Sequence, residues 1–183
     1  MRTTIRIVAA VVVFLLMAGC AEKKKHDDII APKVETPKPQ APIKMQDYRQ
    51  TTDIQWLNKS YQVEVVRTPD DSLRMVKDET GQAYVDNRIS LRVIRADGSI
   101  CFSRTFTKSA FESLLNDDYR NTGILEGFVY DKVDGNRLVF AASVCHPRTD
   151  EYIPIVVTVN NFGDVNIELD TQLDTNGGDE EDA

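Results

Sequence analysis

The sequence predicts a mainly β domain of the α+β class. We expect an antiparallel meander of about 7–8 strands that forms a partial barrel or a sandwich, with one short helix near 110–119. Three observations predict this fold. Short runs of alternating apolar and polar residues recur at roughly ten-residue spacing. Two Asp-Gly pairs, at 97–98 and 134–135, each separate two such runs, as in tight hairpins. Only one stretch after the N-terminal region has apolar residues at helical spacing.

The N-terminus has the layout of a secretory signal. Two arginines in the first six residues precede ten apolar residues, 7–16, and small residues follow. Ala18-Gly19-Cys20 resembles the lipobox of bacterial lipoproteins, which implies cleavage before Cys20 and lipidation of its thiol. A transmembrane helix needs about 20 apolar residues, more than this run offers. A plain secretory signal, with an unmodified Cys20, remains the alternative.

Four segments follow from composition. They are a signal peptide (1–19), a lipidated N-terminus with a Pro/Lys-rich linker (20–46), the antiparallel β domain (47–173) and an acidic tail (174–183). The linker has six lysines, and four prolines within eleven residues, so it should act as an extended spacer. The tail has five acids and no base, and we expect it to be disordered.

Charge excludes one class of partner. The chain has a formal net charge of -7, which becomes -9 once the two arginines of the signal are removed. No basic stripe interrupts the acidic β domain, so we expect no nucleic-acid partner.

The strands are predicted in order from alternation and turn residues. Residues 60–67 form a strand with Tyr61, Val63 and Val65 on one face. A turn at 69–72 precedes a short strand at 73–77, and a turn at 78–82 precedes a short strand at 83–85.

Three hairpins complete the sheet. The first joins 89–96 to 99–106 around Asp97-Gly98, and the second joins 124–133 to 136–145 around Asp134-Gly135. A longer loop joins 153–159 to 165–169. Two-residue loops at the first two turns give these cross-strand pairs: Val93 with Phe102, Leu91 with Arg104, Ile94 with Cys101, Val129 with Phe140, and Leu125 with Val144.

The helix is predicted between the two Asp-Gly hairpins. Ser109 lies three residues before Glu112, the spacing of a capping box. Phe111, Leu114 and Leu115 share one helical face, so the helix should run over 110–119.

Two cysteines remain for the folded domain, Cys101 and Cys145. An exported chain enters an oxidising compartment, and both residues fall on the less apolar face of their hairpins. A disulfide between them is therefore one expectation, and two separate buried thiols are the other.

No constellation for catalysis is present. Cys145 and His146 are neighbours in a strand and so point to opposite faces. No metal-ligand spacing or glycine-rich phosphate loop occurs, and the acidic run 131–136 is explained by a hairpin turn. We therefore expect no enzyme activity, no catalytic residue, no bound metal and no cofactor.

Aromatic residues could form a platform for a glycan or a peptide, although most are expected to pack in the sheet. The candidates are Tyr48, Trp56, Tyr61, Tyr84, Tyr130 and Tyr152. The mixed face of the second hairpin, with Phe128 and Tyr130, is the predicted place for a ligand or partner.

The chain as a whole resembles the uncharacterised domain-of-unknown-function lipoproteins of Bacteroides-type bacteria. The resemblance is carried by residues 18–20, the Pro/Lys linker and the strand-to-helix run 102–111. It implies a lipid-anchored cell-envelope protein, in the outer membrane and facing either the periplasm or the surface. We expect a non-enzymatic binding or structural module whose partner is an envelope protein or a glycan. The alternative is a lipocalin-like carrier of a small hydrophobic ligand.

Overall fold

The computed structural model describes residues 40–171, which belong to a compact unit that begins at Pro39. The predicted signal peptide, the predicted lipidation site Cys20 and the predicted acidic tail lie outside these residues. None of the helices between residues 40 and 171 is long and apolar enough to cross a membrane.

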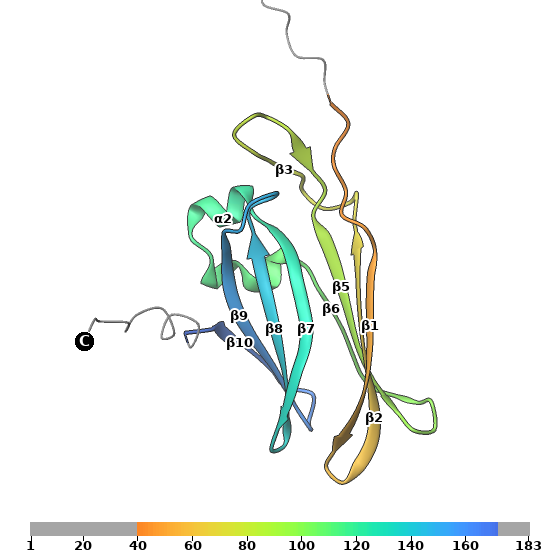
Figure 1. Cartoon of the computed structure of the whole chain (residues 1–183). Coiled ribbons are helices and arrows are strands. Elements are labelled where there is room, and N and C mark those ends of the chain that lie inside the picture. The colour runs from red at the N-terminus through yellow and green to blue at the C-terminus, as the bar shows by residue number, and fades with distance from the viewer. Residues whose placement is uncertain (1–39, 172–183) are drawn as a thin grey trace, which may run out of the picture. The chain divides into compact units, whose positions relative to one another are not determined.

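The described residues form two four-stranded antiparallel sheets and one small hairpin (Figure 1). The first sheet has the order β1 (Tyr48–Trp56), β2 (Lys59–Pro69), β5 (Asn87–Arg95) and β6 (Ile100–Phe106). The second has the order β10 (Val165–Leu169), β9 (Tyr152–Asn160), β8 (Arg137–Cys145) and β7 (Ile124–Asp134). The small hairpin joins β3 (Val76–Lys77) to β4 (Ala83–Tyr84). The mainly β prediction is confirmed, and the described strands form a sandwich with no closed barrel.

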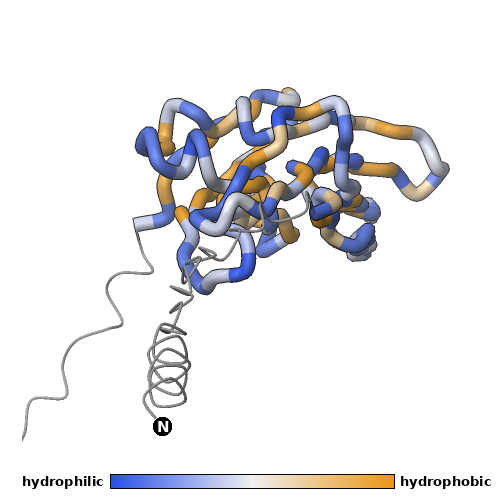
Figure 2. Tube along the Cα trace, turned by 90° about the horizontal axis from the view of Figure 1, so that it is seen from above, coloured by the Kyte–Doolittle hydropathy of each residue, from blue (hydrophilic) through white to orange (hydrophobic). Residues whose placement is uncertain are grey.

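A shared apolar core joins the sheets. Apolar and polar residues alternate along much of the strands (Figure 2), so each strand turns one row of side chains inward. Phe106 of the first sheet lies 5.1 Å, between ring centroids, from Phe128 of the second, which in turn lies 5.4 Å from Phe140. All three rings are buried. Phe128, predicted on a mixed face open to a ligand or partner, is therefore part of the core.

The first Asp-Gly hairpin matches the predicted register along most of its length. Val93 pairs with Phe102 and Leu91 with Arg104, as predicted, but Ile94 pairs with Ile100 instead of Cys101. The loop has three residues, because Arg95 N–H donates to the carbonyl of Ser99 and Gly98 adopts φ +83°. This extra loop residue shifts the register of the last pair by one.

Bulges in β7 explain why the predicted cross-strand pairing of the second hairpin is only partly right. The register shifts between Leu125 and Gly127, and again between Tyr130 and Lys132. Leu125 pairs with Val144 as predicted, but Val129 pairs with Ala141 and is exposed. Each bulge adds a residue to one strand only, which moves the following side chains to the other face.

The predicted helix is split into two pieces. A 3-10 helix, η1, covers Lys108–Leu114, and a short α-helix, α2, covers Asp117–Thr122. Leu115 between them is extended and buried. The capping box at Ser109 does not form; Asn116 instead caps α2, since its side chain accepts the N–H of Tyr119 at 3.0 Å.

Candidate binding site at the hairpin end

The two ends of the sandwich are built differently. The chain enters at the end that carries β3, β4 and α2, which we call the proximal end (Figure 1). There Ile43 forms a parallel bridge to Tyr84, so the ordered contacts begin within the segment predicted as linker. The turns β1–β2, β5–β6, β7–β8 and β9–β10 gather at the opposite end, which we call the hairpin end.

Side chains from both sheets meet at the hairpin end. Within the second sheet, Asn136 of the β7–β8 turn donates to the side chain of Asn161 in the β9–β10 loop at 3.1 Å. A small pocket of about 140 Å³ lies beside them. Its lining comes from three of the hairpins: Trp56, Leu57, Tyr61, Arg95, Cys101, Phe102, Asn160, Asn161, Phe162 and Gly163. The pocket therefore spans the two sheets at their tips.

Four of the residues that line the pocket are aromatic: Trp56, Tyr61, Phe102 and Phe162. The rings of Trp56 and Tyr61 meet edge to face, 5.4 Å between centroids, and the buried indole N–H of Trp56 has no hydrogen-bond partner among the described residues. Phe162 is 83% exposed, and its loop is rigid: the side chain of Asn160 accepts the N–H groups of Phe162 and Asp164, both at 2.9 Å. A large apolar side chain is thus held out in solvent.

The β1–β2 turn adds a second exposed apolar side chain, that of Leu57, and here the backbone is strained. Leu57 and Asn58 have φ values of 53° and 59°, as in a type I′ turn, where Asn-Gly is the favoured pair. A non-glycine residue with a long side chain costs about 1–2 kcal/mol in this left-handed region. Leu57 is nevertheless 45% exposed, and Ile100 of the β5–β6 hairpin is 51% exposed. Strain kept at an exposed position is typical of functional sites.

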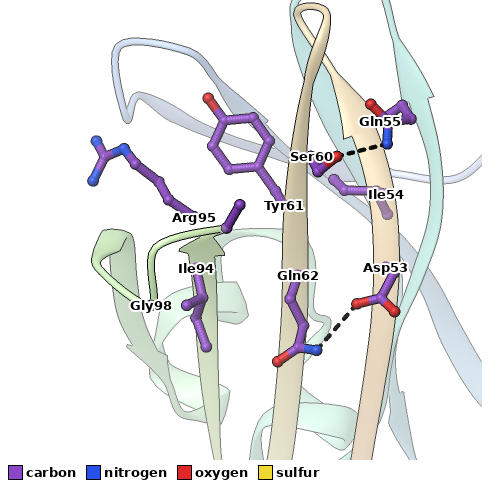
Figure 3. Close-up of a pocket in the computed structure, with 10 residues that line it drawn as sticks. Asp53, Ile54, Gln55, Ser60, Tyr61, Gln62, Ile94, Arg95 and Gly98 are labelled. Atoms are coloured by element: carbon purple, nitrogen blue, oxygen red, sulfur yellow. Dashed lines mark hydrogen bonds between the residues drawn. The ribbon is translucent and has the colours of Figure 1, made fainter.

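A polar groove of about 580 Å³ adjoins this pocket on the outer face of the first sheet (Figure 3). Cross-strand side-chain hydrogen bonds line it: Gln62 donates to Asp53 at 3.0 Å and Gln55 donates to Ser60 at 2.8 Å. Tyr61 and Arg95 line both hollows. The hairpin end therefore offers two hollows side by side, one with aromatic rings in its lining and one crossed by polar side-chain pairs.

The proximal end has a hollow of about 520 Å³ around His146. The imidazole stacks on Tyr119 at 4.0 Å between centroids, and its two nitrogens lie 3.2 Å from the Asp118 carboxylate and 3.0 Å from that of Glu151. Both nitrogens thus face carboxylates of the protein itself. These contacts fix the β8–β9 loop on α2.

The proximal end also contains a buried polar network. Asp86, 3% exposed, accepts the backbone N–H groups of Asn87 and Leu125, each at 2.8 Å. Lys108 lies 3.9 Å from its carboxylate and donates to the carbonyl of Gly123 at 2.6 Å. These bonds tie η1 and the start of β7 to the start of β5, so their role is structural.

A disulfide between Cys101 and Cys145 is one of the two expectations from the sequence, and the structure does not form it. Cys101 and Cys145 are both free thiols. Cys101 lies in the hairpin-end pocket, whereas Cys145 lies opposite Tyr152 at the other end of β8. The eight residues of β8 before Cys145 separate those ends by roughly 26 Å, and a disulfide needs Cα atoms within about 7 Å. The sequence places each cysteine on the less apolar face of its own hairpin, but the two hairpins belong to different sheets, so this does not bring the thiols together.

The neighbouring Cys145 and His146 form no nucleophile pair. The Cys145 thiol lies 3.4 Å from the Ser143 hydroxyl, and burial raises its pKa. A raised pKa favours the thiol over the reactive thiolate. Among residues 40–171, no group of three or more His, Cys, Asp or Glu side chains could hold a metal ion.

Two of the six aromatic candidates lie at the hairpin end, Trp56 and Tyr61. Tyr84 is buried and Tyr130 packs against Phe140. The sequence reasoning missed Leu57, Ile100 and Phe162, which are the exposed apolar residues of the site. The only available signal was the Leu-Asn pair at 57–58, where a tight turn calls for Asn-Gly.

Fold and site together define a β-sandwich domain with exposed apolar side chains at its hairpin end. The chain belongs to the DUF4738 family, a domain of unknown function, whose model matches residues 28–167. No curated protein is detectably similar to the chain.

Proposed function

We propose that this protein is a lipid-anchored, non-enzymatic module of the bacterial cell envelope that binds a partner protein through the hairpin end. The anchor is a lipidated Cys20 in the outer membrane, with the domain facing the periplasm or the surface. The observation that carries the proposal is the strained, exposed Leu57 beside the exposed Phe162.

Energetics favour a protein partner for these side chains. Fully burying a Leu or Phe side chain contributes about 1.5–3 kcal/mol. Aromatic anchors in tight pockets dominate protein interfaces. The fixed β9–β10 loop reduces the entropy that Phe162 would lose on binding.

The position of the site supports a tether at the other end. The described chain begins beside β3 and β4, where Ala41 accepts a hydrogen bond from Gln82. A lipid on Cys20 would therefore attach to the proximal end, and the hairpin end would be the part of the sandwich farthest from the attachment point.

The anchor is tested with Cys20→Ser in the full chain. We expect the wild type in the membrane fraction, labelled by a radioactive or alkyne fatty acid. We expect the variant to be unlabelled and released from the membrane. Labelling of the variant, or its retention at wild-type level, would contradict the anchor and would leave the binding site untouched.

The partner site is tested by cross-linking in intact envelopes, followed by mass spectrometry. Leu57→Asn with Phe162→Ser should abolish the cross-linked species. The matched control is Tyr152→Ser with Leu169→Asn, which removes two exposed apolar side chains away from the hairpin end. Equal loss in both double variants, or loss in neither, contradicts the hairpin end as the site.

A further inference from the structure

The hairpin end consists of two halves, one from each sheet, and the halves carry opposite charge. The turns of the first sheet, 57–59 and 95–99, hold two cations and one acid, so this half is +1. The turns of the second sheet, 134–137 and 160–164, hold one cation and two acids, so this half is -1. The charged side chains, all exposed, are Lys59, Arg95 and Asp97 in the first half and Asp134, Arg137 and Asp164 in the second.

One charge in each half is left without an ion pair. Lys59 of the first half and Asp164 of the second form no salt bridge among residues 40–171, whereas Arg137 binds Asp134. The Asp164 carboxylate accepts only the side-chain amide of Asn160, at 2.9 Å. Both charges are therefore available to a partner molecule.

The exposed apolar side chains divide between the halves in the same way. Leu57 belongs to the first half and Phe162 to the second, and both line the small pocket. The two halves adjoin, because all four turns lie at one end of the sandwich and the pocket has lining residues from both sheets (Figure 1).

Two complementary halves side by side make a surface that can fit a second copy of itself. A two-fold axis places the first half of each copy against the second half of the other, so the same contact forms twice. Leu57 of each copy then meets Phe162 of the other, and opposite charges face each other on both sides of the axis. The chain has a net charge of -7, but the charges of its hairpin end sum to zero, so this end approaches another copy with little repulsion.

We propose that the partner at the hairpin end is a second copy of this chain, and that the protein forms a two-fold symmetric homodimer there. This inference rests on the proposed function, which assigns a protein partner to the hairpin end, and it names that partner. A small molecule is disfavoured as the occupant, because the pocket of about 140 Å³ is smaller than the roughly 300–1,000 Å³ of ligand sites.

The first test is sedimentation equilibrium of the full chain in a density-matched detergent. The wild type should form a dimer that dissociates on dilution. Leu57→Asn with Phe162→Ser should weaken the dimer more than about a hundredfold, because each side chain is buried twice in a two-fold interface. The matched control, Tyr152→Ser with Leu169→Asn, should change the affinity less than about twofold. A dimer that persists in the Leu57/Phe162 variant, or equal loss in the control, would overturn the proposal.

The second test uses charge reversal to examine the two-fold arrangement. Lys59→Glu reverses the charge of the first half and Asp164→Lys that of the second. Each variant alone sets like charges against each other at both contacts, so it should dimerise about tenfold more weakly. Lys77→Glu makes the same charge change as Lys59→Glu, but in β3 at the proximal end, and should have an effect below about twofold.

Mixing the two charge-reversed variants gives the sharpest result. In a dimer of one Lys59→Glu copy and one Asp164→Lys copy, both contacts again join opposite charges, so the affinity should return to about the wild-type value. Two-colour fluorescence transfer measures this mixed dimer. Absence of rescue on mixing would overturn the two-fold arrangement, and thermal unfolding shows that each variant is folded.

Sedimentation and the cross-linking in intact envelopes separate this inference from the proposed function. A self-cross-link that needs Leu57 and Phe162 supports both. A monomeric wild type with a hairpin-dependent cross-link to a different protein would overturn the homodimer and keep the protein-binding site. A monomeric wild type without any cross-link would contradict both.

Discussion

The proximal and hairpin ends of the sandwich differ in how well their groups are satisfied by contacts within the protein. At the proximal end, the buried carboxylate of Asp86 is surrounded by two backbone donors and the Lys108 amine. At the hairpin end, Trp56 keeps an unpartnered N–H, Leu57 is strained and Phe162 stands in solvent. The proximal end resembles a structural junction, and the hairpin end resembles half of an interface.

Stability and binding should therefore depend on different ends of this fold. Substitutions at the proximal end should lower the free energy of unfolding. Substitutions at the hairpin end should cost little stability, or even increase it, while they remove binding.

The largest effect is expected for Asp86→Ala. It leaves two buried N–H groups without an acceptor and the Lys108 amine, whose side chain is 12% exposed, without its carboxylate. We expect a loss of about 3 kcal/mol in the free energy of unfolding. Urea unfolding of the full chain measures it. Asp86→Asn keeps an acceptor oxygen and should lose about half as much; a loss below about 1 kcal/mol for Asp86→Ala would refute the structural role.

The same glycine substitution should differ between the ends. A Cβ on Gly123 would lie 2.7 Å from the backbone oxygen of Tyr119 and 2.8 Å from a methyl group of Val144, so Gly123→Ala should cost about 2 kcal/mol. Gly98 has open space but φ +83°, so Gly98→Ala should cost only about 1 kcal/mol of backbone strain. Thermal unfolding measures the stability of both variants. A larger loss of stability for Gly98→Ala than for Gly123→Ala would contradict the expected difference between the ends.

Leu57→Asn should separate stability from binding. Asn tolerates the left-handed region, so the variant should gain about 0.5–1 kcal/mol in the free energy of unfolding. It should also lose part of the cross-linking to the partner. Leu57→Ala is the control, because it removes the side chain without relieving the strain. A destabilised Leu57→Asn would show that the turn carries no strain.

The smallest effect is a pH dependence at the proximal end. Burial raises the pKa of Asp86, while the N–H groups of Leu125 and Asn87 and the Lys108 cation oppose the rise. The folded state then binds the proton more tightly than the unfolded state, whose pKa is near 3.8. The free energy of unfolding should therefore fall as pH rises from about 4 to the raised pKa, and this term should be constant above it. Asp86→Asn should remove that slope, and an unchanged slope in the variant would assign it to other groups.

Much of the fold could be predicted because its signals are local. Alternation found most of β2, β5 and β6, and the Asp-Gly pairs placed two hairpins. β1 was missed because only Ile54 and Trp56 among its nine residues are buried, which is too weak a pattern for an edge strand. The bulges in β7 depend on packing across the sandwich, so no local pattern reveals them.

The candidate site was less predictable, for a physical reason. Exposure of Phe162 and Ile100 depends on how loops from two sheets meet, and the sequence does not show which loops are neighbours. The separation of Cys101 and Cys145 was unpredictable for the same reason, since the sequence does not show that their hairpins belong to different sheets.

The bridge at Ile43 has a mechanical consequence. Tension on the preceding chain enters the sandwich through the bond from the Gln82 side chain to the carbonyl of Ala41 and through two backbone hydrogen bonds. These run from Ile43 N–H to the carbonyl of Ala83 and from Val85 N–H to the carbonyl of Ile43, both 2.9 Å long. The next backbone pairing is that of Tyr48 with Arg67, five residues later. When these bonds part, the chain would lengthen while the strands stay paired, by the contour length of those five residues, roughly 17 Å, minus the distance that they already span. The bridge would therefore break before the tension reaches the paired strands of the core.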